Sequence, residues 1–162
     1  MAAGSTYEPI ATTTLGSDQT SITFSTISGS YTDIVLIATT PSTQVAQNMK
    51  LELNSDTGTN YSLTTLGGTG SSTFSDRESS TATPSALYLG ADSNAIMHFQ
   101  NYSNTTTYKT VLIRSNAPSN NTMARVLLWR SASAITSIKI KRESTNDIKS
   151  GSTFTLYGIT AA

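Results

Sequence analysis

The sequence of 162 residues contains no cysteine, and this absence excludes two classes of site. Without thiols the chain can form neither a disulfide nor a thiolate-ligated metal centre. Stability must therefore come from packing, backbone hydrogen bonds and subunit contacts. A chain of this length can bury one hydrophobic core without such covalent or metal cross-links.

Charge is also scarce, since ten basic and ten acidic residues give a formal net charge of zero. A nucleic-acid-binding protein normally carries a basic stripe, so we expect no nucleic-acid partner. No apolar run approaches the roughly 20 residues of a membrane helix, and residues 1–7 lack the basic start and apolar stretch of a signal peptide. We therefore expect no membrane partner. We also expect that the protein is made in a cytoplasm and stays there or is assembled there into a larger complex.

Serine and threonine make up about one third of the sequence, a composition that could indicate disorder. Disordered chains, however, usually combine high charge with few aromatic or β-branched residues. Here isoleucine, valine, tyrosine, phenylalanine and threonine are plentiful and clustered, and threonine suits the solvated face of a strand. The composition predicts a folded β-domain with a neutral, hydroxyl-rich surface.

Apolar residues recur with a period of two in many short stretches, which is the pattern of half-buried strands. Met49, Leu51 and Leu53 alternate with charged residues, whereas the continuous run at 34–37 predicts a strand covered on both faces. No window shows a helical period, and 132–135 could form one helical turn at most. The expected strands are 21–27, 33–38, 49–53, 61–66, 96–100, 108–114, 125–130, 138–141 and 153–159.

These strands predict an all-β protein, a single jelly-roll-like antiparallel β-sandwich of about nine or ten strands spanning residues 1–162. Trp129 lies in a dense apolar run and is expected in the core rather than on a binding platform. The predicted core residues are Phe24, Val35, Leu36, Leu51, Leu53, Leu128, Trp129, Phe154 and Leu156.

The segment 54–60 has two interpretations. Asn54, Asp56, Gly58 and Asn60 alternate as calcium ligands do, but an EF-hand loop needs glycine at its sixth position and glutamate at its twelfth. Here glycine is fifth and the twelfth residue is Thr65. A hairpin loop in which Gly58 takes a positive φ explains the same residues, and we favour it while leaving calcium binding open.

Two polar segments lack the apolar residues that would order them, namely an N-terminal arm at 1–7 and a long loop at 67–84. We expect both to contact partners, with Asp76, Arg77 and Glu78 as a possible interface. Asp76 and Glu78 are also the one carboxylate pair worth considering for glycan cleavage. We interpret them as part of a solvated loop.

The remaining candidates for chemistry are few. His98 is the only histidine and is expected to be structural or exposed, because one imidazole cannot build a multi-histidine metal site. Tyr102 and Tyr108 flank a polar loop and could bind sugars or a partner. We favour the alternative, that both rings cap the edge of the core. We predict no catalytic, cofactor-binding or metal-binding residues and no enzymatic activity.

Seven segments spread over most of the chain together form a specific pattern. They are Tyr7–Ala11, Ser21–Phe24, Tyr31–Leu36, Leu51–Ser62, Asn101–Thr110, Leu128–Ser131 and Gly151–Ile159. In these segments the chain resembles a group of tailed-bacteriophage virion proteins that have a β-sandwich domain. The resemblance implies a structural protein of the particle rather than an enzyme, and it implies no catalytic residues.

The resemblance leaves the position in the particle open. The first expectation is a capsid decoration (cement) subunit that stabilises the particle through protein–protein contacts. The alternative is a tail-fibre or receptor-binding module that recognises a host surface glycan. In either case the expected partners are other virion proteins, either the major capsid protein or tail proteins, and the expected location is the virion, assembled in the host cytoplasm. We also expect a homo-oligomer, with a trimer favoured by three-fold positions in capsids.

Overall fold

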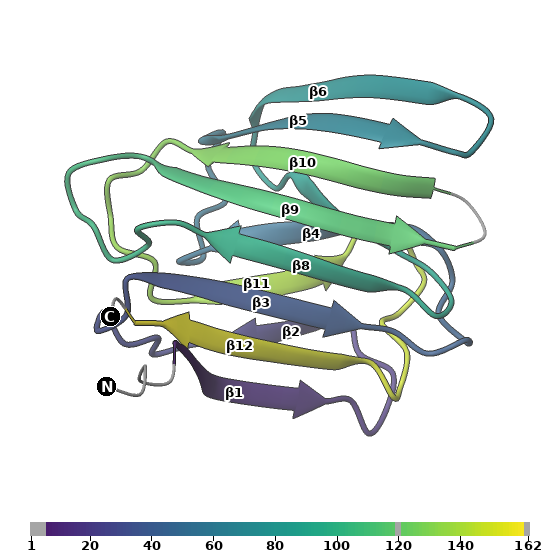
Figure 1. Ribbon diagram of the computed structural model, residues 1–162, viewed down its shortest axis with the longest axis horizontal. Coiled ribbons are helices and arrows are strands. Elements are labelled where there is room, and N and C mark those ends of the chain that lie inside the picture. The colour runs from purple at the N-terminus through teal and green to yellow at the C-terminus, as the bar shows by residue number, and fades with distance from the viewer. Residues whose placement is uncertain (1–5, 119–120, 161–162) are drawn as a thin grey trace.

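Eight strands form the larger of two sheets in a computed structural model that describes residues 6–118 and 121–160 (Figure 1). All neighbouring strands in this sheet are antiparallel. In spatial order they are β1 (Tyr7–Thr14), β12 (Thr153–Ile159), β3 (Asp33–Thr39), β8 (Asn94–Phe99), β9 (Lys109–Ala117), β10 (Asn121–Trp129), β5 (Tyr61–Gly68) and β6 (Thr73–Thr81).

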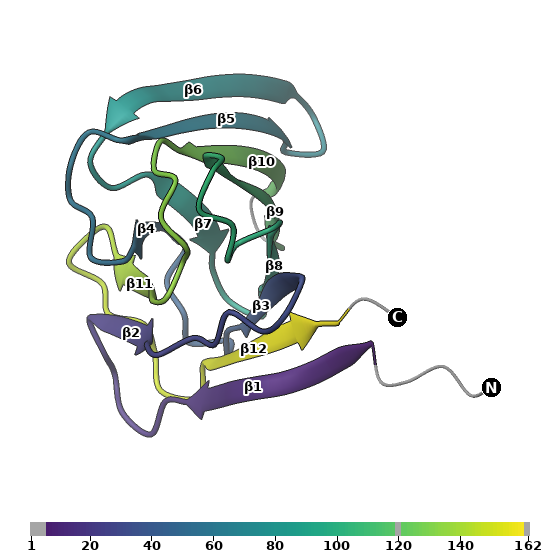
Figure 2. The ribbon, with the colours of Figure 1, turned by 90° about the vertical axis from the view of Figure 1, so that its left-hand side faces the viewer.

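Four shorter strands form the second sheet, which packs against one face of the first. In spatial order they are β2 (Ser21–Phe24), β11 (Ile138–Arg142), β4 (Gln47–Leu53) and β7 (Ser85–Leu89). Figure 2 shows the larger sheet curving around the smaller one, with β6 and β1 at its two ends. The hydrophobic core lies between the sheets, and the opposite face of the larger sheet is its outer face.

The expected fold class is confirmed, because the molecule is an all-β, jelly-roll-like antiparallel sandwich. The described residues contain twelve strands rather than nine or ten. No helical turn forms at 132–135. The described part of the chain includes no helix of the length and hydropathy needed to cross a membrane.

Most of the predicted core is buried between the sheets. Trp129 is only 2% exposed, and Phe24, Leu36, Leu51, Leu53, Phe154 and Leu156 belong to the same cluster. Val35 is buried as predicted, at 2% exposed, but it alternates with the core residues of β3 and therefore lies on the outer face. The prediction for Leu128 was wrong. Leu128 is half-buried, because its neighbours Leu127 and Trp129 take the inward positions of β10.

The prediction of a long loop at 67–84 was wrong, and the predicted arm at 1–7 is described only from residue 6 on. Most of 67–84 belongs to strands, since β5 runs to Gly68 and β6 spans Thr73–Thr81, so Asp76, Arg77 and Glu78 lie on an edge strand. Tyr7 begins β1, while residues 1–5 of the predicted arm lie outside the described residues. Both strands have almost no buried side chains, and pairing with β5 or β12 orders them instead.

The segment 54–60 is a tight turn, but it does not close a hairpin. It joins β4 in the smaller sheet to β5 in the larger one, so the chain crosses the sandwich here. Asn54 and Ser55, rather than Gly58, take positive φ values of 52° and 58°. Asparagine enters this conformation more readily than most residues, and Asn54 is held in it by the segment 134–137: its Nδ2 donates to the carbonyl of Ala134 at 2.7 Å and its Oδ1 accepts from the backbone of Thr136 at 2.8 Å.

Candidate functional site

The outer face of the larger sheet carries two neighbouring cross-strand rows of side chains. Strand register brings together residues that are far apart in sequence, and alternate positions along each strand face the core. The first row is Tyr157, Val35, His98, Leu112, Val126, Thr64 and Arg77. The second row is Thr155, Ile37, Ile96, Arg114, Ala124, Leu66 and Ser75.

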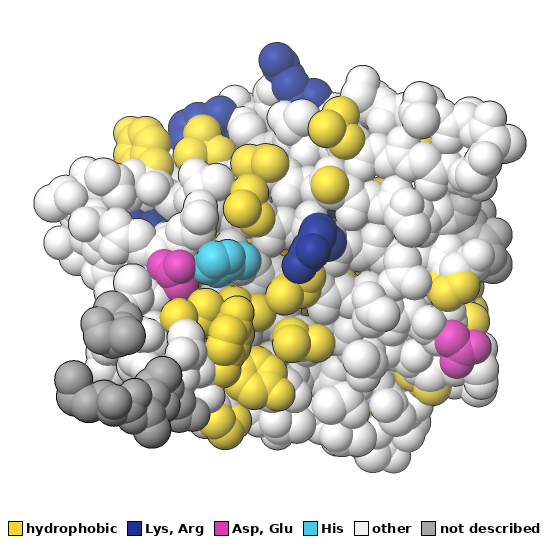
Figure 3. Space-filling view, in the orientation of Figure 1, with side chains coloured by type: hydrophobic (Ala, Val, Ile, Leu, Met, Phe, Trp, Pro, Cys, Tyr) yellow, Lys and Arg dark blue, Asp and Glu magenta, His cyan; other side chains and the backbone are white. Residues whose placement is uncertain are grey.

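The apolar members of these rows form the outer-face patch, which consists of Val35, Ile37, Leu66, Ile96, Leu112 and Val126. Leu66, Val126 and Leu112 are 61%, 47% and 42% exposed. Figure 3 shows these apolar side chains gathered on a surface that is otherwise mostly uncharged and polar. A hollow of about 420 Å³ lies over the patch, with Tyr7 among its lining residues. Contiguous exposed apolar area of this kind commonly marks an interaction site.

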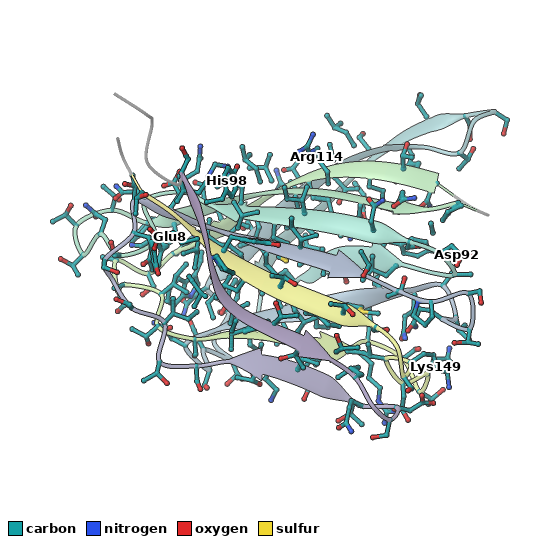
Figure 4. All side chains as sticks on the ribbon, turned by 60° about the horizontal axis from the view of Figure 1, so that its bottom comes forward. Glu8, Asp92, His98, Arg114 and Lys149 are labelled. Carbon is teal, nitrogen blue, oxygen red and sulfur yellow. The ribbon has the colours of Figure 1, made fainter. Side chains whose placement is uncertain are left out.

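Charged groups lie within this apolar surface. In Figure 4, His98 on β8 and Arg114 on β9 project from the same side of the sheet. Nε2 of His98 lies 2.9 Å from Oδ2 of Asp33, while Oδ1 of Asp33 accepts a hydrogen bond of 2.7 Å from the backbone of Asn101. Asp33 is thus held in place and orients the imidazole. Among the described residues His98 contacts this aspartate but no serine, so the geometry is that of a half-buried histidine–aspartate pair rather than a triad.

The predicted carboxylate pair lies at a different place, on the inward side of β6. Asp76 and Glu78 are two residues apart on a strand and share one face, whereas Arg77 joins the outer row. The two acids line a polar cleft of about 310 Å³, together with Tyr88 of β7 and Arg125 of β10. The cleft lies where the edge of the larger sheet extends over the edge of the smaller one. In Figure 2, β6 lies at the top of the sandwich, above β7.

The carboxylate of Asp56 is fully engaged by donors within the protein. Oδ2 accepts 2.7 Å and 3.0 Å hydrogen bonds from Nε1 of Trp129 and Nδ2 of Asn60, and Oδ1 accepts a 2.8 Å bond from the Gly58 backbone. Burial alone would raise the pKa of Asp56, but these hydrogen bonds outweigh it and hold the pKa below its usual value. The described residues contain no group of three or more acidic or histidine side chains suited to a metal ion. The segment is therefore a turn held by hydrogen bonds within the protein, but the predicted hairpin, with Gly58 at positive φ, was wrong.

The two tyrosines that flank 103–107 behave differently. Tyr102 is completely buried, and its hydroxyl donates a hydrogen bond to the carbonyl of Ser28. Burial raises its pKa. Tyr108 is 60% exposed. The expectation that both rings cap the core is therefore right for Tyr102 and wrong for Tyr108.

Two features of the surface were missed in the sequence. The outer-face patch could have been found, because β9 and β10 contain unbroken apolar runs at 111–113 and 126–129, where a strand with one solvated face should alternate. The inward position of Arg125 had no comparable signal. An arginine at the start of an apolar run is normally taken as the end of a strand, and here the strand begins four residues earlier.

Comparisons with known proteins show that this chain is similar in fold to several solved structures. No family model and no curated protein matches the sequence. Among solved structures, galectin LEC-6 of Caenorhabditis elegans is 10% identical, with a TM-score of 0.40 over 93% of this chain and 96% of the galectin. An exo-inulinase from Aspergillus awamori is 13% identical, with a TM-score of 0.47 over 94% of this chain and 29% of the inulinase. An alginate lyase from Aplysia kurodai is 10% identical, with a TM-score of 0.34 over 84% of this chain and 72% of the lyase. At these identities the likeness concerns the sandwich fold alone.

Proposed function

We propose that the protein is a non-enzymatic structural subunit of a bacteriophage particle, a capsid decoration protein that associates with further copies of itself through the outer face of its larger sheet. The observation that carries this proposal is the outer-face patch, in which Leu66, Leu112 and Val126 stay exposed on a hydroxyl-rich molecule. Its phage character rests on the sequence resemblance alone.

A second copy of the chain is the occupant that the charge distribution favours. The formal net charge is zero, so two copies approach without long-range repulsion. The carboxylate of Asp33 beside His98 and the guanidinium of Arg114 carry opposite charges on one surface and can pair across a symmetric interface. Copies related by symmetry would bury the same apolar residues on each subunit.

The oligomeric state of the purified protein tests this assignment. Light scattering after size exclusion, at about 100 μM, should give a closed oligomer: a trimer where three patches meet around a three-fold axis, or a dimer where one patch pairs with the same patch of a second copy. Val126→Asp and Leu112→Asp each place a charge in the buried centre of the interface and should shift the protein to monomers. Thr23→Asp, an exposed position on β2 of the other sheet, is the matched control and should leave the oligomer intact. A wild-type monomer at this concentration would refute the interface.

Copy number in purified particles tests the position in the virion. Quantitative mass spectrometry should find hundreds of copies per particle if the protein decorates the capsid. A dozen copies or fewer would instead favour a tail or fibre subunit. Absence of the protein from particles would contradict the virion assignment altogether.

A further inference from the structure

Arg125 is a buried cation with unused hydrogen-bonding groups. It occupies an inward position of β10 and is only 6% exposed. Nη2 donates to Oδ1 of Asn48 at 3.1 Å and contacts Sδ of Met123 at 3.0 Å. Nε and Nη1 have no partner among the described residues. Buried donors are almost always paired, and an unpaired charged one is costly, so a guanidinium held in this way needs a functional explanation.

The groups around Arg125 are acids, amides and rings. Burial lowers the pKa of Arg125, whereas the nearby carboxylates of Glu78, Glu143 and Asp76 raise it, and an arginine stays charged in either case. Asp76 and Glu78 line the same cleft as Arg125, and Tyr88 contributes an aromatic wall. Donors, acceptors and an apolar surface therefore converge on one concave site.

The charges of the cleft restrict what can bind. Among the lining residues, Arg125 contributes one positive charge and Asp76 and Glu78 contribute two negative charges. The two carboxylates disfavour an anion, and the guanidinium disfavours a metal ion that has only two acidic ligands available. A neutral polyhydroxyl ligand satisfies both kinds of group, because each hydroxyl both donates and accepts hydrogen bonds.

We propose that this cleft binds a neutral saccharide, with one sugar residue seated between β6, β7 and β10. Nε and Nη1 of Arg125 donate to ligand oxygens, and the carboxylate of Asp76 accepts from ligand hydroxyls. Glu78 shares its carboxylate between the ligand and the backbone of Ser85, which donates to it at 3.2 Å. The ring of Tyr88 packs against the apolar face of the sugar. The cleft volume of about 310 Å³ lies at the lower end for ligand pockets, which fits a single residue or the end of a glycan chain.

This site is independent of the proposed interface, because it opens on the other side of the larger sheet. A decoration subunit with such a cleft could hold the particle to glycans at a cell surface. Saccharide binding in this cleft is also what the alternative function, a tail-fibre or receptor-binding module, would require.

Ligand-observed saturation-transfer NMR on the full-length protein tests the proposal. The probes are glucose, galactose, mannose and N-acetylglucosamine, each at about 10 mM. At least one should bind with a Kd of roughly 1 mM. Arg125→Met, which keeps the length of the side chain and removes its donors, should weaken binding at least about tenfold. Asp76→Asn should weaken saccharide binding by a similar factor, because it replaces a carboxylate, which only accepts hydrogen bonds, with an amide.

Matched variants separate binding from folding. Arg130→Met and Asp92→Asn make the same chemical changes outside the cleft, and both should bind like wild type. Arg125→Met also removes the 3.1 Å hydrogen bond to Asn48, so its circular dichroism and unfolding midpoint are compared with those of wild type before binding is measured. Asp76 is exposed, so its variant keeps the test valid if Arg125→Met misfolds. Failure of all four sugars to bind, or equal binding by Asp76→Asn and wild type, would overturn the proposal.

Discussion

The largest side chains of the core have their polar ends tied to the turn that crosses between the sheets. Trp129 and Tyr61 stack at 6.3 Å between ring centroids. The indole donates to Asp56, and the hydroxyl of Tyr61 accepts a 3.0 Å hydrogen bond from the backbone of Leu53. Tryptophan and tyrosine are tolerated in a core when such partners exist. Position 56 thus connects the core to the 54–60 turn.

Asp56→Asn should destabilise the protein in a pH-dependent manner. The pKa of Asp56 is lowered in the folded state, so its contribution to the free energy of unfolding is complete above the unfolded value of about 3.9. The contribution is lost as the pH falls through the lower folded pKa. At neutral pH the variant should lose about 1.5–3 kcal/mol, the range for hydrogen bonds to a charged group.

Denaturant unfolding at a series of pH values, followed through Trp129 emission, checks this expectation. The difference between wild type and Asp56→Asn should be constant from pH 7 to about pH 5 and should narrow below about pH 4. A difference that stays the same down to pH 2 would mean that the carboxylate charge is not what stabilises the turn.

Trp129→Ala should cost about 3–5 kcal/mol of unfolding free energy, as other large truncations in cores do. The indole is buried against both sheets and carries the hydrogen bond to Asp56. Urea denaturation followed by far-ultraviolet circular dichroism measures the loss without relying on tryptophan emission. Native wild-type emission typical of a water-exposed indole would contradict the burial on which this figure depends.

At the level of strands, sequence prediction missed three strands: β7, which is short and buried at nearly every position, and β1 and β6, which pairing alone orders. β4 and β12 have alternating burial and were placed within two residues of their bounds. β6 and β1 are the outermost strands of the larger sheet and expose most of their residues, so their sequences carry no apolar period. The charges at 76–78 instead suit an edge strand, where they hinder pairing with another chain.

Gly67→Ala should loosen β6 from the sheet. A methyl group at position 67 would lie 2.2 Å from the ring of Phe74, its cross-strand neighbour on β6, so the ring must leave its place. Because Phe74 is partly exposed, we expect a loss of only about 1 kcal/mol, with faster amide exchange along β6.

Gly68→Ala is the control for this change. A methyl group there meets only the backbone oxygen of Ser72, at an ordinary contact distance of 3.6 Å. Hydrogen exchange should therefore resemble wild type in Gly68→Ala and be faster for β6 in Gly67→Ala. Equal exchange in the two variants would show that the packing of Phe74 on Gly67 does not hold the edge strand.

For the molecule as a whole, the sequence predicted the class of the fold better than the location of its surfaces. The carboxylates at 76 and 78 were recognised as a pair, but their partner Arg125 is about fifty residues away and meets them only through strand order. The outer-face patch likewise draws on five strands, β3, β5, β8, β9 and β10, whose register no local pattern encodes. Cross-sheet neighbours of this kind depend on topology, which the spacing of apolar residues does not determine.

Strand β10 connects the two proposed surfaces, because its alternate residues face opposite ways. Val126 belongs to the outer-face patch, whereas the adjacent Arg125 takes an inward position and lines the polar cleft, although it also borders the hollow over the patch. We therefore expect two neighbouring substitutions to have separate effects. Val126→Asp should abolish the oligomer and leave saccharide binding per subunit unchanged, while Arg125→Met should abolish saccharide binding and leave the oligomer intact.

Light scattering and saturation-transfer NMR on both variants measure the two properties. Loss of both properties in either variant would indicate that the two faces of the sheet are coupled and do not act as independent surfaces.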